Sequence, residues 1–127
     1  MKNQIIAAVI NKYFNFLIKE YGAHVEEDES SIKFINSNFQ ICIVRYRGDT
    51  VLSVAPANAK AEDWLELGDI VTFRRGDNRH NYGMVTSSDD ESIVRHYANL
   101  VKAFCNEMLN GDFSDAPLIR RYIQEIK

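Results

Sequence analysis

The sequence predicts an α+β fold: a four-stranded antiparallel meander preceded by one helix and followed by three helices packed on one face. Two observations predict this class. The apolar residues change from a helical to an alternating period near residue 23 and return to a helical period after residue 60. The polar separators between the strands are too short for the crossovers that parallel strands need. With 127 residues, the chain has the usual size of one domain, so we expect a single α+β domain over residues 1–127.

The first helix is expected from Lys2 to Tyr21. Apolar residues recur there at steps of three and four, and Gly22 follows where a glycine commonly ends a helix. Ile5 and Phe16 widen the apolar face beyond one stripe. We therefore expect this helix to pack on more than one side.

The meander is expected from about residue 23 to residue 56, because short runs of β-branched and aromatic residues alternate there with short polar separators. The expected strands are Ala23–Glu27, Ser31–Asn36, Phe39–Tyr46 and Thr50–Ala55. Alternation in the third strand places four residues on one face: Phe39, Ile41, Ile43 and Arg45. The other face receives Gln40, Cys42, Val44 and Tyr46. Pro56 ends the meander, because proline cannot donate to a central ladder.

The second helix is expected from Trp64 to about Arg75, with Asp63 as its cap. Gly68 weakens this assignment, since an interior glycine costs about 1 kcal/mol relative to alanine. Residues 70–73 can therefore also be interpreted as a strand.

Two more helices are expected after the polar loop 76–83. Ser87 or Ser88 caps the third helix, and acidic residues in its first turn complement the positive helix end. Its apolar face comprises Ile93, Tyr97, Leu100, Val101, Phe104, Cys105 and Met108, and Gly111 stops it. Ser114 or Asp115 caps the last helix, with Pro117 in its first turn. Its inward side chains are expected to be Leu118, Ile119, Tyr122, Ile123 and Ile126.

Motifs that indicate catalysis or metal binding are absent from the sequence. The three histidines, His24, His80 and His96, have no metal-ligand spacing. Neither GxSxG nor a glycine-rich phosphate loop occurs. Cys42 and Cys105 lie in apolar runs and are interpreted as buried thiols in a reducing compartment. We therefore expect no enzyme, no metal and no cofactor. A signal peptide and a membrane span are also missing, which favours the cytoplasm.

Clustered acidic residues are the most visible polar feature, although solvation and helix capping explain many of them. We interpret them as an acidic docking face for a basic partner, with Trp64 as an aromatic anchor. The expected partner-binding residues are Glu26, Glu27, Asp28, Glu29, Glu62, Asp63, Trp64, Glu66 and Asp69. Three residues of the 76–83 loop complete the set: Arg79, His80 and Tyr82. The net charge of −3 argues against direct binding of nucleic acid.

Two phrases carry a resemblance to a known family. One is Asp63-Trp64-Leu65-Glu66-Leu67-Gly68-Asp69-Ile70 after the meander, and the other is Leu109-Asn110-Gly111-Asp112-Phe113-Ser114 closing a long helix. With the size and layout, they resemble the immunity proteins of bacterial polymorphic-toxin systems, including contact-dependent growth inhibition. The resemblance implies a protein that binds a cognate toxin domain and occludes its active site. Many such toxins are nucleases, whose basic surfaces an acidic inhibitor would match.

The leading hypothesis is therefore a cytoplasmic immunity-type protein that neutralises a cognate toxin domain, as a monomer or weak homodimer without contact to membranes. One alternative is a small-ligand-binding protein or enzyme that uses the 76–83 loop, with His80, Arg79 and Tyr82 around a cleft. A further alternative is a structural adaptor that self-associates through the wide apolar face of the first helix.

Overall fold

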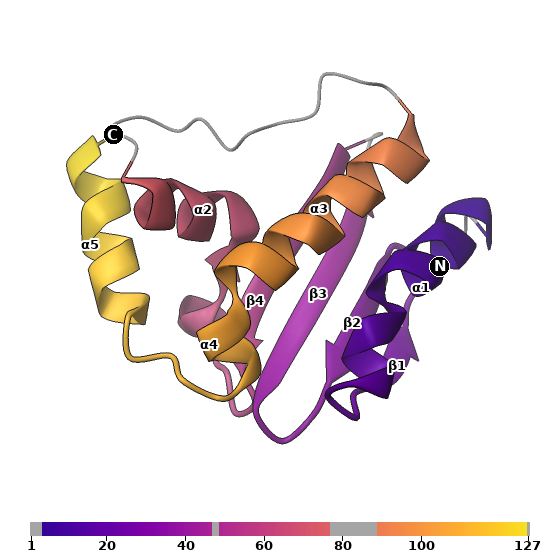
Figure 1. The fold of residues 1–127 in the computed structure, drawn as a ribbon, viewed down its shortest axis with the longest axis horizontal. Coiled ribbons are helices and arrows are strands. Elements are labelled where there is room, and N and C mark those ends of the chain that lie inside the picture. The colour runs from indigo at the N-terminus through magenta and orange to yellow at the C-terminus, as the bar shows by residue number, and fades with distance from the viewer. Residues whose placement is uncertain (1–3, 47–48, 77–88, 127) are drawn as a thin grey trace.

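The computed structural model describes residues 4–46, 49–76 and 89–126, which form one sheet and a layer of helices (Figure 1). The strands are β1 (His24–Glu27), β2 (Ser31–Ile35), β3 (Phe39–Tyr46), β4 (Asp49–Pro56) and β5 (Leu65–Glu66). The helices are α1 (Gln4–Lys19), the 3-10 turn η1 (Ala61–Asp63), α2 (Leu67–Arg75), α3 (Asp90–Phe104), α4 (Asn106–Leu109) and α5 (Ala116–Ile126). The α+β class predicted from the sequence is therefore confirmed.

The sheet has five antiparallel strands in the order β1-β2-β3-β4-β5, where four were predicted. The first four form the expected meander. The additional strand, β5, has two residues: Leu65 pairs with Val54, and Glu66 pairs with Ser53. Two residues are too few for an alternating pattern, so this strand exists through its pairing with β4 and not through a signal of its own.

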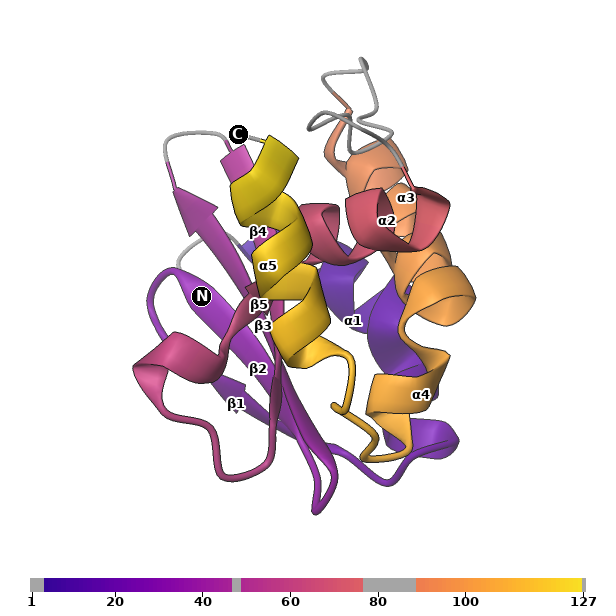
Figure 2. The same ribbon diagram turned by 90° about the vertical axis from the view of Figure 1, so that its left-hand side faces the viewer.

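The α-helices lie on one side of the sheet, whereas the short η1 turn lies on the other side (Figure 2). In both ribbon views α1 and α3 lie over the same face, and α2 packs between the sheet and α5. The core between the layers contains Phe14, Phe34, Phe39, Ile41, Ile43, Ile70, Met108 and Leu109, all at most 1% exposed. Within the described ranges, no α-helix covers the opposite face of the sheet, where the segment with η1 and Trp64 lies over one end.

The second helix begins at Leu67, three residues later than predicted. Leu65 and Glu66 are extended because they pair with β4, and Glu66 stands at the N-terminal boundary of α2. Residues 70–73 are helical, which resolves the alternative of a strand. Gly76 ends the helix in the left-handed region with φ of 71°, a conformation that glycine adopts without a Cβ clash.

The predicted third helix is divided at Cys105 into α3 and α4. The spacing of apolar residues in the sequence could not show this break, because the buried residues keep three- and four-residue steps across it. Asp89 is the N-cap of α3, since its side chain accepts a hydrogen bond from the Glu91 backbone N–H at 3.0 Å. The predicted caps, Ser87 and Ser88, lie outside the described residues.

Three apolar side chains depart from the predicted burial. Leu118 was expected to point inward but is 48% exposed, while Ala116 contributes to the core from the same helix. Ile5 was expected to widen the packed face of α1 but is 80% exposed. Cys42 was expected to be buried but is only half-buried, on the sheet face that lacks α-helices.

None of the described helices is long and apolar enough to cross a lipid bilayer.

Candidate functional site

The segment between β4 and α2 holds many of the residues predicted to bind a partner. After Pro56 ends β4, the chain passes through η1 and returns alongside β4 as β5. Leu65 is buried against the core at 4% exposure. Because side chains alternate along a strand, Glu66 projects to the opposite side of β5 from Leu65.

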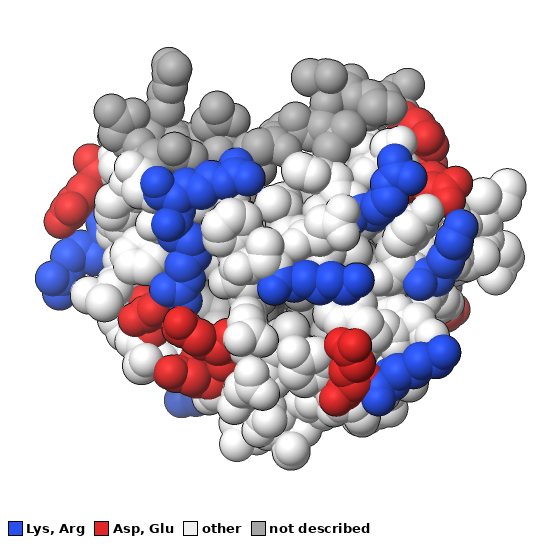
Figure 3. All heavy atoms as spheres, viewed as in Figure 1, with Lys and Arg blue, Asp and Glu red and all other residues white. Residues whose placement is uncertain are grey.

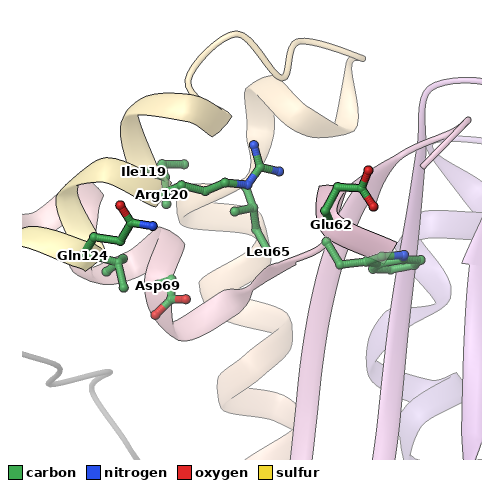
Figure 4. Close-up of a pocket in the computed structure, with 8 residues that line it drawn as sticks. Glu62, Leu65, Asp69, Ile119, Arg120 and Gln124 are labelled. Carbon is green, nitrogen blue, oxygen red and sulfur yellow. The ribbon is translucent and has the colours of Figure 1, made fainter. Parts of the chain in front are cut away.

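A groove of about 280 Å³ lies between this segment and α5 (Figure 4). Three buried apolar side chains form its base: Leu65, Ile119 and Ile123. Its other lining residues are Glu62, Trp64, Asp69, Arg120 and Gln124. The fold therefore brings together three of the predicted partner-binding residues, Glu62, Trp64 and Asp69, with two residues of α5.

The groove contains charges of both signs. Arg120 reaches from α5 toward Glu62, whereas Asp69 and Gln124 lie at the other end (Figure 4). Among the described residues, neither Arg120 nor Glu62 takes part in an ion pair. Both charges are therefore available to groups on a binding partner. Two carboxylates against one guanidinium leave the groove with a net negative charge.

Trp64, the only tryptophan of the chain, is half-buried and lies between two surfaces. It lines the groove, and the Lys33 ammonium group lies 6.0 Å from the centre of its ring. That distance is at the limit of a cation–π contact. Because Lys33 belongs to β2, the indole connects the groove with the sheet face that has no α-helices over it.

The acidic residues 26–29 are placed at the edge strand β1 and the turn that follows it, and all four are exposed. The structure gives two of them local roles. Glu26 lies 3.1 Å from the ring of His24, and an oxygen of Asp28 accepts a hydrogen bond from the Glu29 backbone N–H at 2.8 Å. This group does not reach the groove, but Glu26 and Glu66 lie on the same face of the sheet.

Asp63 has a structural role. Its carboxylate accepts a hydrogen bond from the Lys60 backbone N–H at 2.9 Å and so closes the η1 turn. This contact fixes the approach of the chain to Trp64. Asp63 is absent from the groove lining, so we assign it to positioning the segment.

The face covered by helices does not form a surface of one sign. Basic and acidic side chains are intermixed there (Figure 3). Arg74 contacts Asp115 at 2.6 Å and Glu107 at 3.4 Å, and Arg45 pairs with Asp90. These arginines join elements of the fold. Their charges are therefore paired with carboxylates of the same chain.

The thiols are poorly suited to nucleophilic chemistry. Burial raises the pKa of Cys105 to about 12, and burial also raises the pKa of Cys42. A high pKa keeps both groups protonated near neutral pH, where the thiolate is the reactive form. In the described ranges, no group of His, Cys, Asp and Glu side chains is arranged to hold a metal ion.

Three of the predicted partner-binding residues, Arg79, His80 and Tyr82, lie outside the described residues. The alternative cleft at the 76–83 loop depends on them and stays a prediction. In contrast, Arg120 and Gln124 are groove residues that the sequence reasoning missed. Their four-residue spacing places both on one face of α5, but only the tertiary packing of α5 shows what that face lines.

No family model, curated protein or solved structure matches the chain.

Proposed function

We propose that this chain is a cytoplasmic immunity-type protein that binds a cognate bacterial toxin domain and neutralises it by occluding the active site of the toxin. In this proposal the chain performs no catalysis and needs no cofactor. It acts as a monomer or weak homodimer and does not bind nucleic acid directly.

The observation that supports this function best is the convergence of Glu62, Trp64 and Asp69 in one groove with an apolar base. Binding interfaces commonly combine an aromatic anchor, an apolar centre and a charged rim. The groove of about 280 Å³ is slightly smaller than most small-molecule sites, which span about 300–1,000 Å³. It has room for one or two side chains of a partner protein, and its net negative charge favours basic ones.

The proposal predicts that the gene directly upstream of this chain encodes a protein with a toxic C-terminal domain, and the test uses that domain. That domain is produced from an inducible promoter with and without the chain, and growth is followed. We expect growth arrest by the domain alone, rescue by the chain, and a complex of the two purified proteins by calorimetry. Full toxicity in the presence of folded chain, with no complex at high micromolar concentrations, would contradict the proposal.

The contribution of the groove is tested with Trp64→Ala and with Glu62→Lys/Asp69→Lys. Truncating an aromatic hot spot costs about 2 kcal/mol or more of binding free energy, or roughly thirtyfold in Kd. The matched control is Glu20→Lys/Glu125→Lys, which makes the same charge change at two exposed glutamates of the helical layer. Circular dichroism must show that each variant folds. If the control weakens the complex as much as the groove variants do, then binding reflects net charge and not this groove.

A further inference from the structure

The sheet face opposite the α-helices holds more apolar side chains than a solvent-exposed sheet face normally does. Register places Lys33, Cys42 and Ser53 in one row across this face. Ser31, Val44 and Val51 form the next row, and Ile35, Gln40 and Ala55 form the third. We call these nine residues of β2, β3 and β4 the outer sheet face. Their inward-facing neighbours, such as Ile32, Ile43 and Leu52, are buried under the helices.

An antiparallel sheet with one solvated face normally alternates apolar residues inward with polar residues outward. Here the alternation fails in the central strands. Ile35, Cys42 and Val44 are only partly buried, and Val51 is 41% exposed. The chain after β4 covers one end of this face, because Ala55 is 0% exposed and the Gln40 side chain donates hydrogen bonds to the backbone carbonyls of Pro56 and Ala57. The apolar side chains that stay partly exposed beyond this end indicate an interaction site, because leaving them in water is unfavourable.

Carboxylates surround this apolar centre on three sides. Glu26 stands in the row of Lys33 at the β1 edge, and Glu66 stands in the same row at the β5 edge. Asp49, two residues before Val51 in β4, projects to the same face at the end of the sheet and is exposed. Lys33 is the only cation among these positions. The outer sheet face therefore has an apolar centre and a rim of net negative charge.

The sheet edges are less suitable for a partner than the face. The edge strand β1 has the sequence His-Val-Glu-Glu, and charged edge strands resist pairing with a further strand. The other edge strand, β5, has only two residues, so it offers a short ladder at most. A second copy of this chain would bring one acidic rim against another, and like charges across an interface are unfavourable.

From this arrangement we propose that the outer sheet face is a second docking surface, continuous with the groove through Trp64, for a basic surface of a protein partner. The partner surface has an apolar centre and lysine or arginine side chains that meet Glu26, Asp49 and Glu66. This inference rests on the proposed function and adds to it the place and the charge of the larger contact. Lys33 forms the boundary toward Trp64, where its ammonium lies 6.0 Å from the indole ring.

The test uses the full chain, labelled with nitrogen-15, and a short soluble peptide of alternating arginine and valine as the probe. A peptide with glutamate in place of arginine is the reference. We expect the arginine peptide to shift amide resonances of β2, β3 and β4, with an affinity that falls as salt is added. The glutamate peptide should leave these resonances in place. Shifts confined to the helical layer, or equal shifts with both peptides, would overturn the inference.

Variants locate the contact. Glu26→Lys/Glu66→Lys should weaken binding of the arginine peptide by roughly tenfold, and Val44→Ser/Val51→Ser should also weaken it without a change of charge. The matched control, Glu20→Lys/Glu125→Lys, should change the affinity by less than about twofold. A control as damaging as the rim variant would overturn the inference. So would a dimeric mass by light scattering that Val44→Ser/Val51→Ser converts to a monomer.

The same variants separate this inference from the proposed function. If Glu26→Lys/Glu66→Lys still neutralises the upstream-encoded domain as well as the unchanged chain does, the outer sheet face is not the docking surface, although the immunity function stands. If the peptide results hold but no toxin domain is neutralised, the immunity function fails and the basic-partner surface remains.

Discussion

Cys105 shows how burial sets the chemistry of a single residue. Cys105, at the break between α3 and α4, is buried, and burial raises the pKa of its thiol to about 12, which keeps it protonated. Cys42 is half-buried on the outer sheet face, and its pKa is raised as well. We expect maleimide at neutral pH to modify Cys42 slowly and Cys105 only after denaturation. Mass spectrometry distinguishes the two, with Cys42→Ser as the control. Modification of Cys105 in the folded chain would contradict this description of the core.

Gly111 has a backbone conformation and a close neighbour that both disfavour a side chain. Its φ is +90°, and a Cβ added there would lie 3.1 Å from Oδ1 of Asn38. Gly76 also has a positive φ, but its added Cβ would meet open space. Gly76→Ala should therefore lower the free energy of unfolding by about 1 kcal/mol, through backbone strain alone. Gly111→Ala should lower it further, because the Asn38 side chain must also shift. Urea denaturation measures both, and equal losses would contradict the close contact.

Between elements, the packing of α1 on α3 is strengthened by a polar contact at Glu91. Its carboxylate accepts a hydrogen bond from the Tyr13 hydroxyl at 2.7 Å and contacts the Lys12 ammonium at 3.2 Å. The Tyr13 hydrogen bond is the main reason that the pKa of Glu91 lies below the ordinary value of 4.5, and Lys12 lowers it further.

A pH dependence follows from this contact. Since the folded-state pKa is lowered, the stabilisation is complete above the unfolded pKa and is lost as pH falls through the folded pKa. We expect the difference in unfolding free energy between the unchanged chain and Glu91→Gln to be constant near neutral pH and to shrink below about pH 4.5. Urea denaturation at a series of pH values measures it. A difference that grows on acidification would contradict the assignment.

The periodicity of apolar residues predicted the structure correctly where a helix or strand is long. The eight residues of β3 and the amphipathic face of α1 repeat often enough to be recognised. The periodicity failed as a guide at positions where tertiary contacts determine the secondary structure or the burial of a side chain. The pairing with β4 converts the start of the predicted second helix into β5, and the break at Cys105 leaves the spacing of buried residues intact. Leu118 could not be distinguished from Ile119 by composition, because only the docking of α5 decides which one faces the core.

For the whole molecule, the same limit applies to the candidate site. The sequence marks Glu62, Trp64 and Asp69 as neighbours along the chain, but it does not show that α5 completes their groove with Arg120. Nor does it show that Glu26 and Glu66 share a cross-strand row, because that relation depends on the register of four strand pairs. The residues of the candidate site could therefore be predicted in part from the sequence. Their arrangement in a groove and on a sheet face could not, because it depends on the tertiary fold.

Arg74 joins α2 to α4 and to the start of α5, the helix that lines one side of the groove. Its guanidinium, in a side chain 21% exposed, contacts Asp115 at the start of α5 and Glu107 in α4. Replacing it with methionine keeps the apolar stem and leaves both carboxylates without this partner. Because hydrogen bonds to charged groups are worth about 1.5–3 kcal/mol, we expect Arg74→Met to lower the unfolding free energy by about that amount. It should also speed amide exchange in α5.

The consequences for binding should differ between the two surfaces. Arg74→Met loosens α5 and so weakens contacts that depend on the groove, whereas the outer sheet face, built from β2, β3 and β4, should bind the arginine peptide as before. Arg121→Met is the control, because Arg121 is exposed on α5 and takes part in no ion pair among the described residues. If Arg74→Met weakens both surfaces equally while the chain stays folded, then the groove and the sheet face are coupled, and the division of binding between them is wrong.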